Sequence, residues 1–294
     1  MSTETSVSRR HPQWIRAKMP GMGEFAYTQK VLRDSNLHTV CEEAQCPNRS
    51  ECYAHRTATF MILGNVCTRR CAFCAVPQAI PPAPPDPEEP ARLAEAVTRL
   101  NLQHVVITSV DRDDLPDQGA EHYVRCVEAV AERQPSARIE LLIPDFRGDG
   151  NALHIVLKAP IHVLGHNIET VPRLYPVARR GARYARSILL LKRAKDMRPD
   201  VLTKTGLMLG LGEDEDEVEL VLADLRDADV DIVTLGQYLQ PTPLQLPVSR
   251  YLSPKEFEYW REKALHMGFR WVEAGPLVRS SYHAWAHVEH AQVG

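Results

Sequence analysis

The sequence predicts an α/β protein built on a partial (β/α)6 barrel of the TIM type, with an extension at each end. Nearly continuous apolar runs alternate with longer stretches of helical periodicity, which is the pattern of a parallel sheet covered by helices on both faces. The chain has 294 residues, and one barrel-type domain commonly takes about 250. Because six strand–helix units are found rather than eight, we expect a barrel that is open on one side.

The barrel is expected to occupy residues 57–250. Residues 1–56 show no clear strand–helix rhythm, and we interpret them as an extension that packs against the main domain. The six strands are predicted at 57–64, 104–110, 138–143, 161–167, 202–211 and 231–239. Helices are predicted at 88–100, 120–134, 182–197 and 213–229.

A proline-rich stretch, 75–90, lies between the first strand and the first helix of the barrel. So many prolines exclude regular structure and favour a stiff, extended connection. A linker between two domains is the alternative. We disfavour it because the first strand would then have no helix to complete its unit.

Residues 251–294 form the predicted C-terminal extension. A helix is expected from Ser253 to Met267, because Ser253 suits the N-cap, Pro254 the first helical position and Glu256 the third. A short strand is expected at 271–274, followed by the segment GPLVRSSYHAWAHVEH.

Composition excludes several classes of protein. The net charge is −3, with 44% hydrophobic and 25% charged residues, whereas a nucleic-acid-binding domain is normally strongly basic. No apolar run approaches the roughly 18 residues of a membrane helix, and the first residues carry no secretory signal. We therefore expect a cytoplasmic protein with neither nucleic acid nor membrane as its partner.

Six of the seven cysteines fall into two triplets. Cys41, Cys46 and Cys52 are spaced C-x4-C-x5-C. Cys67, Cys71 and Cys74 are spaced C-x3-C-x2-C. Three thiolates suit a 4Fe–4S cluster whose fourth iron takes a ligand other than cysteine. Two triplets therefore predict two 4Fe–4S clusters.

Other uses of these cysteines are less favoured. Disulfides need an oxidising compartment, and a structural zinc ion needs four ligands, usually as two closely spaced pairs. Only Cys71 and Cys74 form such a pair. Soft thiolate ligands favour iron–sulfur clusters among the remaining metals. The seventh cysteine, Cys126, lies in an amphipathic helical pattern, and we interpret it as a small buried hydrophobic residue.

The second triplet reads CTRRCAFC, with Phe73 directly before the last cysteine. This loop resembles the cluster loop of the radical S-adenosylmethionine (SAM) enzymes. In that superfamily the amino and carboxylate groups of SAM chelate the open iron, and an electron from the cluster cleaves SAM to give a 5′-deoxyadenosyl radical. The resemblance implies SAM as a cofactor, with Phe73 near its adenine.

Polar residues gather where the predicted strands end, which is where parallel α/β folds bind ligands. For any single residue, a polar loop or a helix cap is an equally good explanation. As a group around the cluster loop, they favour a SAM site, since an amine and two ribose hydroxyls need hydrogen-bond acceptors. The predicted SAM contacts are Ser109, Asp111, Asn167 and Glu169.

Several segments in a fixed order resemble the lipoyl synthase family. They include TVCEEAQCPN, CTRRCAFC, ITSVDRDDLPD, HNIETVPRLY and GPLVRSSYHA, and they extend from Thr39 to Ala284. The resemblance implies insertion of two sulfur atoms, at carbons 6 and 8 of an octanoyl chain on a lysine of a lipoyl carrier domain. The sulfur comes from the auxiliary cluster, here the one expected on Cys41, Cys46 and Cys52.

The family's fourth ligand to the auxiliary cluster is a serine of an RSSY motif. The resemblance assigns this ligand to Ser281, with Ser280 as the second choice, and gives Arg279 an electrostatic or positioning role. An alkoxide is a harder ligand than a thiolate and should release iron more readily. An N-cap for the last helix is the competing role for Ser281, and a surface salt bridge for Arg279.

The resemblance also implies partners. These are octanoylated carriers, namely 2-oxoacid dehydrogenase acyltransferase subunits and the glycine cleavage H protein, and a ferredoxin or flavodoxin as reductant. A monomer is expected. The alternatives are another radical SAM sulfur-inserting enzyme, of the biotin synthase or methylthiotransferase kind, or an iron–sulfur electron carrier. A carrier would usually close every iron with cysteine, whereas each triplet here lacks a fourth.

Overall fold

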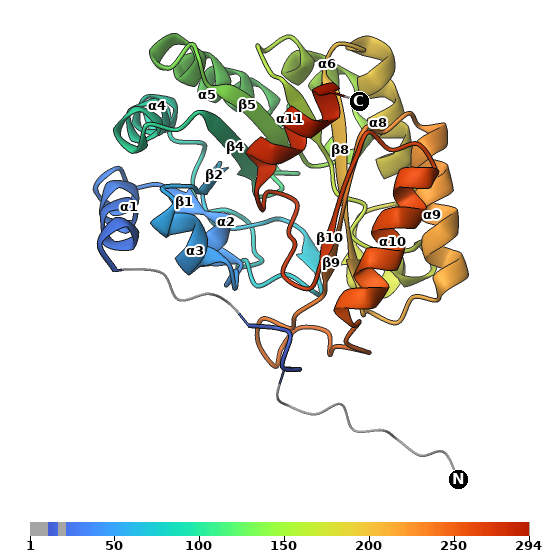
Figure 1. The fold of residues 1–294 in the computed structure, drawn as a ribbon. Helices are drawn as coiled ribbons and strands as arrows, with labels where there is room; N and C mark the ends of the chain where they lie inside the picture. Colours follow the sequence, from blue (N-terminus) through green and yellow to red (C-terminus); the bar gives the residue numbers. More distant parts are fainter. Residues whose placement is uncertain (1–10, 17–21, 294) are drawn as a thin grey trace.

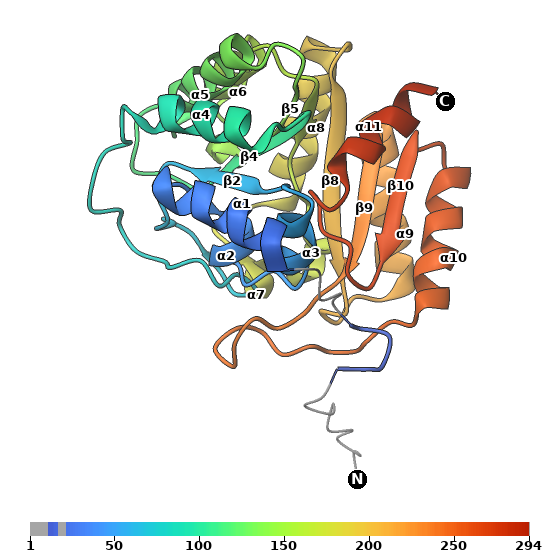
Figure 2. The same cartoon turned by 60° about the vertical axis from the view of Figure 1, so that its left-hand side comes forward.

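A computed structural model describes residues 11–16 and 22–293 as a curved, mostly parallel sheet wrapped by helices (Figures 1 and 2). The strand order is β1-β2-β4-β5-β6-β8-β9-β10. All neighbours from β2 to β10 are parallel, and β1 joins β2 antiparallel. The strands are β1 (His38–Thr39), β2 (Thr59–Ile62), β4 (His104–Ser109), β5 (Arg138–Leu142), β6 (Val163–Gly165), β8 (Leu202–Leu209), β9 (Ile232–Gln237) and β10 (Trp271–Gly275). The six predicted strands are confirmed.

Helices lie on the outer side of this sheet (Figure 2). The predicted ones are confirmed as α4 (Glu89–Leu100), α5 (Ala120–Arg133), α8 (Tyr184–Met197) and α9 (Glu215–Asp227). Helix α6 (Gly150–Leu157) was not predicted. Its eight residues are mostly apolar, so they show little amphipathic period, and its start depends on the side chain of Asp149, which accepts from Asn151 N at 2.8 Å.

The N-terminal region contains three helices that the sequence analysis did not predict. They are α1 (Met22–Asp34), α2 (Val40–Glu43) and α3 (Arg49–Ala54). Helix α1 packs on α3 and α4, burying Val31 and Leu32, and Thr28 Oγ1 donates to Tyr53 O at 2.7 Å. Part of the predicted extension, residues 1–10 and 17–21, lies outside the described residues.

The C-terminal region follows the prediction and adds to it. Helix α10 (Pro254–His266) begins with the expected capping box between Ser253 and Glu256. The predicted short strand is β10, which pairs parallel with β9 and so extends the sheet. Helix α11 (Ala284–Val293) then crosses toward the amino ends of the strands (Figure 1). There Val288 and Ala291 pack on Val163, Leu202 and Ile232.

A two-stranded sheet, separate from the barrel, joins β3 (Arg70–Cys71) to β7 (Arg179–Arg180). Three short helices surround this region: η1 (Phe146–Gly148), η2 (Pro172–Leu174) and α7 (Tyr175–Ala178). The proline-rich stretch after β3 is irregular apart from a bridge between Cys67 and Gln78, which agrees with its predicted role as a connection. The β3–β7 pair was not predicted, because strands of two residues leave no periodicity to detect.

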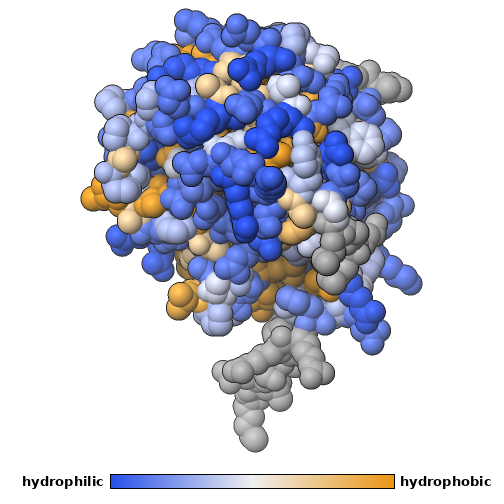
Figure 3. All heavy atoms as spheres, turned by 90° about the vertical axis from the view of Figure 1, so that its left-hand side faces the viewer, coloured by the Kyte–Doolittle hydropathy of each residue, from blue (hydrophilic) through white to orange (hydrophobic). Residues whose placement is uncertain are grey.

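Among the described residues, no helix is both long and apolar enough to cross a membrane. Figure 3 shows one face of the molecule, which is mainly hydrophilic with apolar side chains scattered over it.

Candidate active site

A cavity of about 530 Å³ at the carboxyl ends of the strands brings together the predicted site residues. Both cysteine triplets reach it: Cys41, Cys46, Cys67, Cys71 and Cys74 line it. Cys52 does not line the cavity and is half-buried behind it in α3. The other predicted residues on its wall are Phe73, Ser109, Asp111, Asn167, Glu169, Arg279, Ser280 and Ser281.

The loop of the second triplet leaves β2 through a left-handed turn at Leu63 and Gly64, where φ is 69° and 88°. Backbone hydrogen bonds then fix the loop to separate parts of the chain. Cys67 N donates to Pro77 O at 2.8 Å, Thr68 N to Asp111 O at 3.0 Å, and Ala72 N to Ala178 O at 2.8 Å. The loop geometry is therefore set by contacts that are distant in sequence.

Arg69 anchors the same loop electrostatically, and its side chain is only 5% exposed. Its guanidinium contacts three carboxylates, with Nη2 at 2.9 Å from Asp113 and 2.6 Å from Asp145, and Nε at 3.3 Å from Asp111. Burial acts to raise the pKa of Asp145, but the charge and hydrogen bond of Arg69, together with the nearby His166 and Arg186, bring that pKa to about 2. Arg69 was not among the predicted site residues, although its position inside CTRRCAFC was a signal.

Asp111 therefore faces the cluster loop as well as the cavity. Its Oδ2 lies 3.7 Å from Cys67 Sγ, and burial raises the pKa of this carboxyl group although Arg69 opposes the rise. Ser109, from the end of β4, donates to Val110 O at 2.7 Å. Both residues line the cavity, but both are already engaged by protein groups.

Asn167 and Glu169 form the opposite wall, after β6. Asn167 Nδ2 donates to Glu169 Oε1 at 3.1 Å and to Ser280 Oγ at 3.4 Å. Glu169 adopts a left-handed φ of 69° and is fixed to β8 through Gly206 O and Met208 N, both at 2.9 Å. Burial raises the pKa of the Glu169 carboxyl. A Cβ on Gly206 would lie 2.9 Å from Asn167 Oδ1, so a larger residue at this position would displace the Asn167 side chain.

The first triplet is carried by short helices rather than by an open loop. Cys41 belongs to α2, whose N-cap Thr39 accepts from Glu42 N at 3.3 Å. Cys52 belongs to α3, and Cys46 lies in the turn between the two helices. The backbone of Thr59 hydrogen-bonds the Cys41 thiol, which places β2 against this triplet.

The RSSY segment, far away in sequence, lies directly on the first triplet. Asn48 Nδ2 donates to Leu277 O at 2.6 Å, and Tyr282 OH donates to Glu51 Oε2 at 3.2 Å. Thr59 Oγ1 donates to Ser281 Oγ at 2.7 Å. Close packing on β9 also depends on Gly236, because a Cβ there would clash with Val278 O.

Arg279 lies between the two walls of the cavity. Its Nη1 donates to Val278 O at 2.6 Å. Burial lowers the pKa of its guanidinium, while Cys46 and Glu169 both act electrostatically in the opposite direction. Arg279 is thus close enough to influence groups on both sides.

The two triplets fit 4Fe–4S clusters better than single metal ions. All six thiols are free, and burial raises the pKa of Cys41 and of Cys67 to about 12, so metal binding is what would deprotonate them. A zinc ion holds its thiolates about 2.3 Å away and so brings them close together. Within the described ranges, neither triplet has its sulfur atoms within 4.8 Å of one another.

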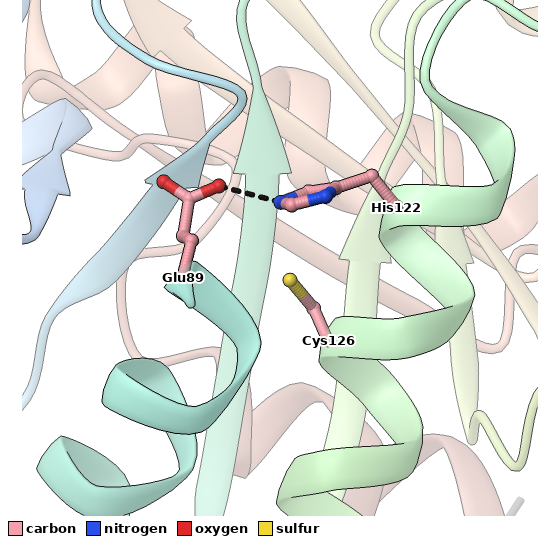
Figure 4. A group of neighbouring side chains, drawn as sticks. All are labelled: Glu89, His122 and Cys126. Atoms are coloured by element: carbon pink, nitrogen blue, oxygen red, sulfur yellow. Dashed lines mark hydrogen bonds and ion pairs between the residues drawn. The ribbon is translucent and has the colours of Figure 1, made fainter. Parts of the chain in front are cut away.

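A buried group of Glu89, His122 and Cys126 does meet that distance and lies between α4 and α5 (Figure 4). His122 Nε2 is 2.7 Å from Glu89 Oε2, and Arg125 Nη2 is 3.3 Å from His122 Nδ1. Because arginine only donates, Nδ1 is the acceptor and Nε2 carries the proton given to Glu89. The ring therefore has no lone pair left for a metal ion.

This group instead supports the turn before the cluster loop. Glu89 Oε2 also accepts from Leu63 N at 2.9 Å. Cys126 is fully buried, which confirms its interpretation as a core residue. Glu89 and His122 were not predicted, since a glutamate at a helix start and a histidine within a helix have many ordinary roles.

Comparisons with known proteins agree on one family. The profile of the radical SAM superfamily matches residues 61–225, and the profile of the N-terminal domain of lipoyl synthase matches residues 2–46. The lipoyl synthase of Laribacter hongkongensis is 55% identical over 276 residues, 94% of this chain and 87% of the relative. That of Thiobacillus denitrificans is 54% identical over 277 residues, 94% of this chain and 89% of the relative.

Solved structures of other enzymes share this fold. The FeFe-hydrogenase maturase HydG from Carboxydothermus hydrogenoformans aligns with a TM-score of 0.60 at 14% identity, covering 79% of this chain and 56% of HydG. Methylornithine synthase (PylB) aligns with a TM-score of 0.55 at 18% identity, covering 68% of this chain and 60% of PylB. At such low identities the likeness concerns the fold alone, and it confirms the partial barrel.

Proposed function

The chain belongs to the lipoyl synthase family of the radical SAM superfamily, and from this premise we propose which of its residues carry the reaction. The enzyme inserts two sulfur atoms, at carbons 6 and 8 of an octanoyl chain attached to a lysine of a lipoyl carrier protein. When bound, two 4Fe–4S clusters and SAM supply the electron, the 5′-deoxyadenosyl radical and the sulfur.

Cys67, Cys71 and Cys74 are assigned to the SAM-binding cluster. The support is their common loop on the cavity wall and its anchoring by Arg69. The ion pairs of Arg69 hold the loop in place, and its three cysteines, which line the cavity, would hold the cluster there. A radical reaction needs preorganisation of this kind, because a radical that is misplaced relative to its substrate reacts at the wrong atom.

Asn167 and Glu169 are assigned to the amine and ribose of SAM. They supply oxygen acceptors beside the cluster loop, and Glu169 is held rigidly by β8. Ser109 and Asp111 complete the opposite wall, with the charge of Asp111 balanced by Arg69. Phe73, on the cluster loop itself, is assigned to the adenine.

Cys41, Cys46 and Cys52 are assigned to the auxiliary cluster, with Ser281 as its fourth ligand. Ser281 is favoured over Ser280 by its partners. Its hydroxyl accepts from Thr59, whose backbone contacts the Cys41 thiol, whereas Ser280 accepts from Asn167 on the SAM side. Arg279, adjacent to both serines, is assigned an electrostatic role toward the auxiliary cluster.

The octanoyl chain is assigned to the apolar part of the cavity. Met61, Leu142, Leu207 and Met208 line the same cavity as the cysteines of the two triplets. Burial of each methylene of an alkyl chain is favourable by about 0.8 kcal/mol. These apolar side chains would therefore bind the octanoyl chain, while Asn167 and Glu169 bind SAM. Leu142, Leu207 and Met208 come from the LLIP and GLML segments that the sequence analysis suggested.

The functional division of the chain follows from these assignments. Residues 1–56 carry the cysteines of the auxiliary cluster, residues 57–250 form the SAM-binding barrel, and residues 251–294 carry Ser281, the proposed fourth ligand. The carriers are acyltransferase subunits of 2-oxoacid dehydrogenases and the glycine cleavage H protein. A ferredoxin or flavodoxin supplies electrons, and the enzyme works as a monomer.

The observation that carries these assignments is the meeting of both triplets and the RSSY segment at one cavity. Anaerobic reconstitution should give about eight irons per chain, four for each cluster. Incubation with SAM, reductant and an octanoyl-lysyl peptide should release 5′-deoxyadenosine together with thiolated peptide. Four irons, bound zinc, or deoxyadenosine without any sulfur-containing product would contradict the assignments.

A further inference from the structure

The outer side of the β3–β7 sheet carries two arginines. Arg70 and Arg180 are directly opposite each other in the register, as are Cys71 and Arg179. Since side chains alternate along a strand, Cys71 and Arg179 line the cavity while Arg70 and Arg180 are exposed. The wall of the active site therefore has a basic outer surface.

Such a pair is unfavourable without an anionic partner, because like charges directly opposite in a sheet repel. Across residues 11–16 and 22–293, no carboxylate pairs with Arg70 or Arg180. Some exposed arginines on other surfaces do have such partners, as Arg56 does in Glu24 and Arg173 does in Glu217. The β3–β7 surface thus retains uncompensated positive charge.

A groove of about 410 Å³ continues this surface along α8. Four arginines line it: Arg147, Arg183, Arg186 and Arg193. Its two acids are already in use, since Asp145 binds Arg69 and Arg186 and Asp149 caps α6. Apart from Arg186, these arginines have no carboxylate partner in the described part of the chain.

We propose that this basic face, formed by Arg70, Arg147, Arg180, Arg183 and Arg193, docks an acidic surface of the octanoylated carrier protein. The proposal rests on the proposed function. Its position suits that role, because Ala182 lines the cavity and the next residue, Arg183, lines the groove. A carrier held there would sit beside the cavity that receives its acylated lysine.

Charge favours a protein over a nucleic acid as the occupant. The net charge of the chain is −3, so the basic residues form a local patch and not the extended basic surface of a nucleic-acid-binding domain. A local patch complementary to an acidic partner speeds and orients association, and its effect falls with ionic strength.

The test is the double substitution Arg180→Glu and Arg183→Glu. Neither change should unfold the protein: the first replaces a like-charge pair opposite Arg70 with an opposite-charge pair. The second places a negative charge at the start of α8, where the helix dipole favours one. The melting temperature should therefore stay the same or rise, and no cysteine is replaced.

Two measurements follow. In a binding titration without reductant, the Kd for the octanoylated glycine cleavage H protein should rise roughly tenfold at low salt, and less at high salt. In turnover, KM for the same carrier should rise similarly, while the rate with an octanoyl-lysyl peptide stays within about twofold. Arg133→Glu, an exposed arginine at the end of α5, is the matched control and should change neither value.

An unchanged Kd for the carrier would overturn the docking proposal, and so would equal impairment with carrier and peptide. Reduced binding of a short duplex RNA, with carrier binding unaffected, would assign the face to nucleic acid instead. Charge-dependent binding of the carrier without sulfur insertion by the wild-type enzyme would leave docking intact and overturn the proposed function.

Discussion

The two ends of the barrel both bury charged groups, but the charges serve different purposes. At the carboxyl end, Arg69 fixes a loop of cysteines beside a cavity. At the amino end, Lys204 Nζ binds Glu140 Oε1 at 2.7 Å and His104 Nε2 lies 3.2 Å from Glu140 Oε2, beneath α11. At the carboxyl end, the cysteine thiols beside the network remain free. At the amino end, the charge of Lys204 is neutralised by Glu140 within the network itself.

One segment of the chain connects the two ends. Strand β10 begins at the amino end with Trp271, which stacks on His290 of α11 at 4.2 Å between ring centroids. The chain then lines the cavity from Val278 to Ser281 and returns as α11. Packing at the amino end therefore helps to position Ser281 at the carboxyl end.

The largest effect is expected at the carboxyl end, where substituting a cysteine of one triplet should abolish a different product than substituting a cysteine of the other. Cys71→Ala should abolish release of 5′-deoxyadenosine, because the SAM-binding cluster loses a ligand. Cys46→Ala should keep that release but give no thiolated product, because the sulfur source is lost. Both products can be quantified by mass spectrometry after anaerobic turnover with an octanoyl-lysyl peptide. If both variants fail in the same way, the triplets do not have separate roles.

The two serines are expected to differ in a similar manner. Ser281→Cys should assemble the auxiliary cluster yet yield little product, since thiolate is a softer ligand that holds iron more firmly. Ser280→Ala should retain the product and raise KM for SAM, because Ser280 contacts Asn167. Iron content and single-turnover product yield distinguish these outcomes. Full product formation by Ser281→Cys would exclude the labile-ligand role.

The third effect is on stability. Arg69→Leu removes the partner of three carboxylates and should destabilise the fold by about 3–5 kcal/mol. Arg173→Leu removes an exposed pair with Glu217 and should cost less than about 1 kcal/mol. Urea unfolding at neutral pH measures both, and equal effects would mean that the Arg69 network adds nothing to an ordinary surface pair.

The same variant has a pH signature. The folded pKa of Asp145, about 2, lies below the ordinary value of an aspartate, so the unfolded state binds the proton first as pH falls. Wild-type stability should therefore decline from about pH 4 toward pH 2. In the Arg69→Leu variant, stability should fall less than in the wild type between about pH 4 and pH 2.

The sequence predicted what depends on local pattern. The triplet spacings drew attention to six cysteines, five of which line the cavity, and the rule that ligands gather at strand ends led to Asn167 and Glu169, which line it too. The sequence did not predict the contact of Thr59 with Ser281 or the Arg69 network, because each joins segments that only the folded chain brings together. Helices α1 and α6 were missed because tertiary packing, rather than a strong amphipathic period, stabilises them.

The smallest effect belongs to the amino end and concerns His287 of α11. This side chain is fully buried, and neither ring nitrogen has a hydrogen-bond partner within the described part of the chain. It faces Lys204, Glu140, His104 and His283, with Glu273 Oε2 at 3.8 Å. Burial lowers its pKa to about 2, with Lys204 adding to the effect.

Because the folded pKa lies below the ordinary value near 6.5, the unfolded state binds more protons as pH falls, and stability should fall from pH 6.5 downward. Between pH 6.5 and 5 this amounts to about 2 kcal/mol, at 1.36 kcal/mol per pH unit. His287→Gln should lose that much less stability than the wild type over the same range. The comparison of slopes is unaffected by any constant cost of placing an amide there. If His287→Gln keeps the wild-type slope, α11 does not hold this histidine neutral, and the amino end is more open to water than the packing of Val288 and Ala291 implies.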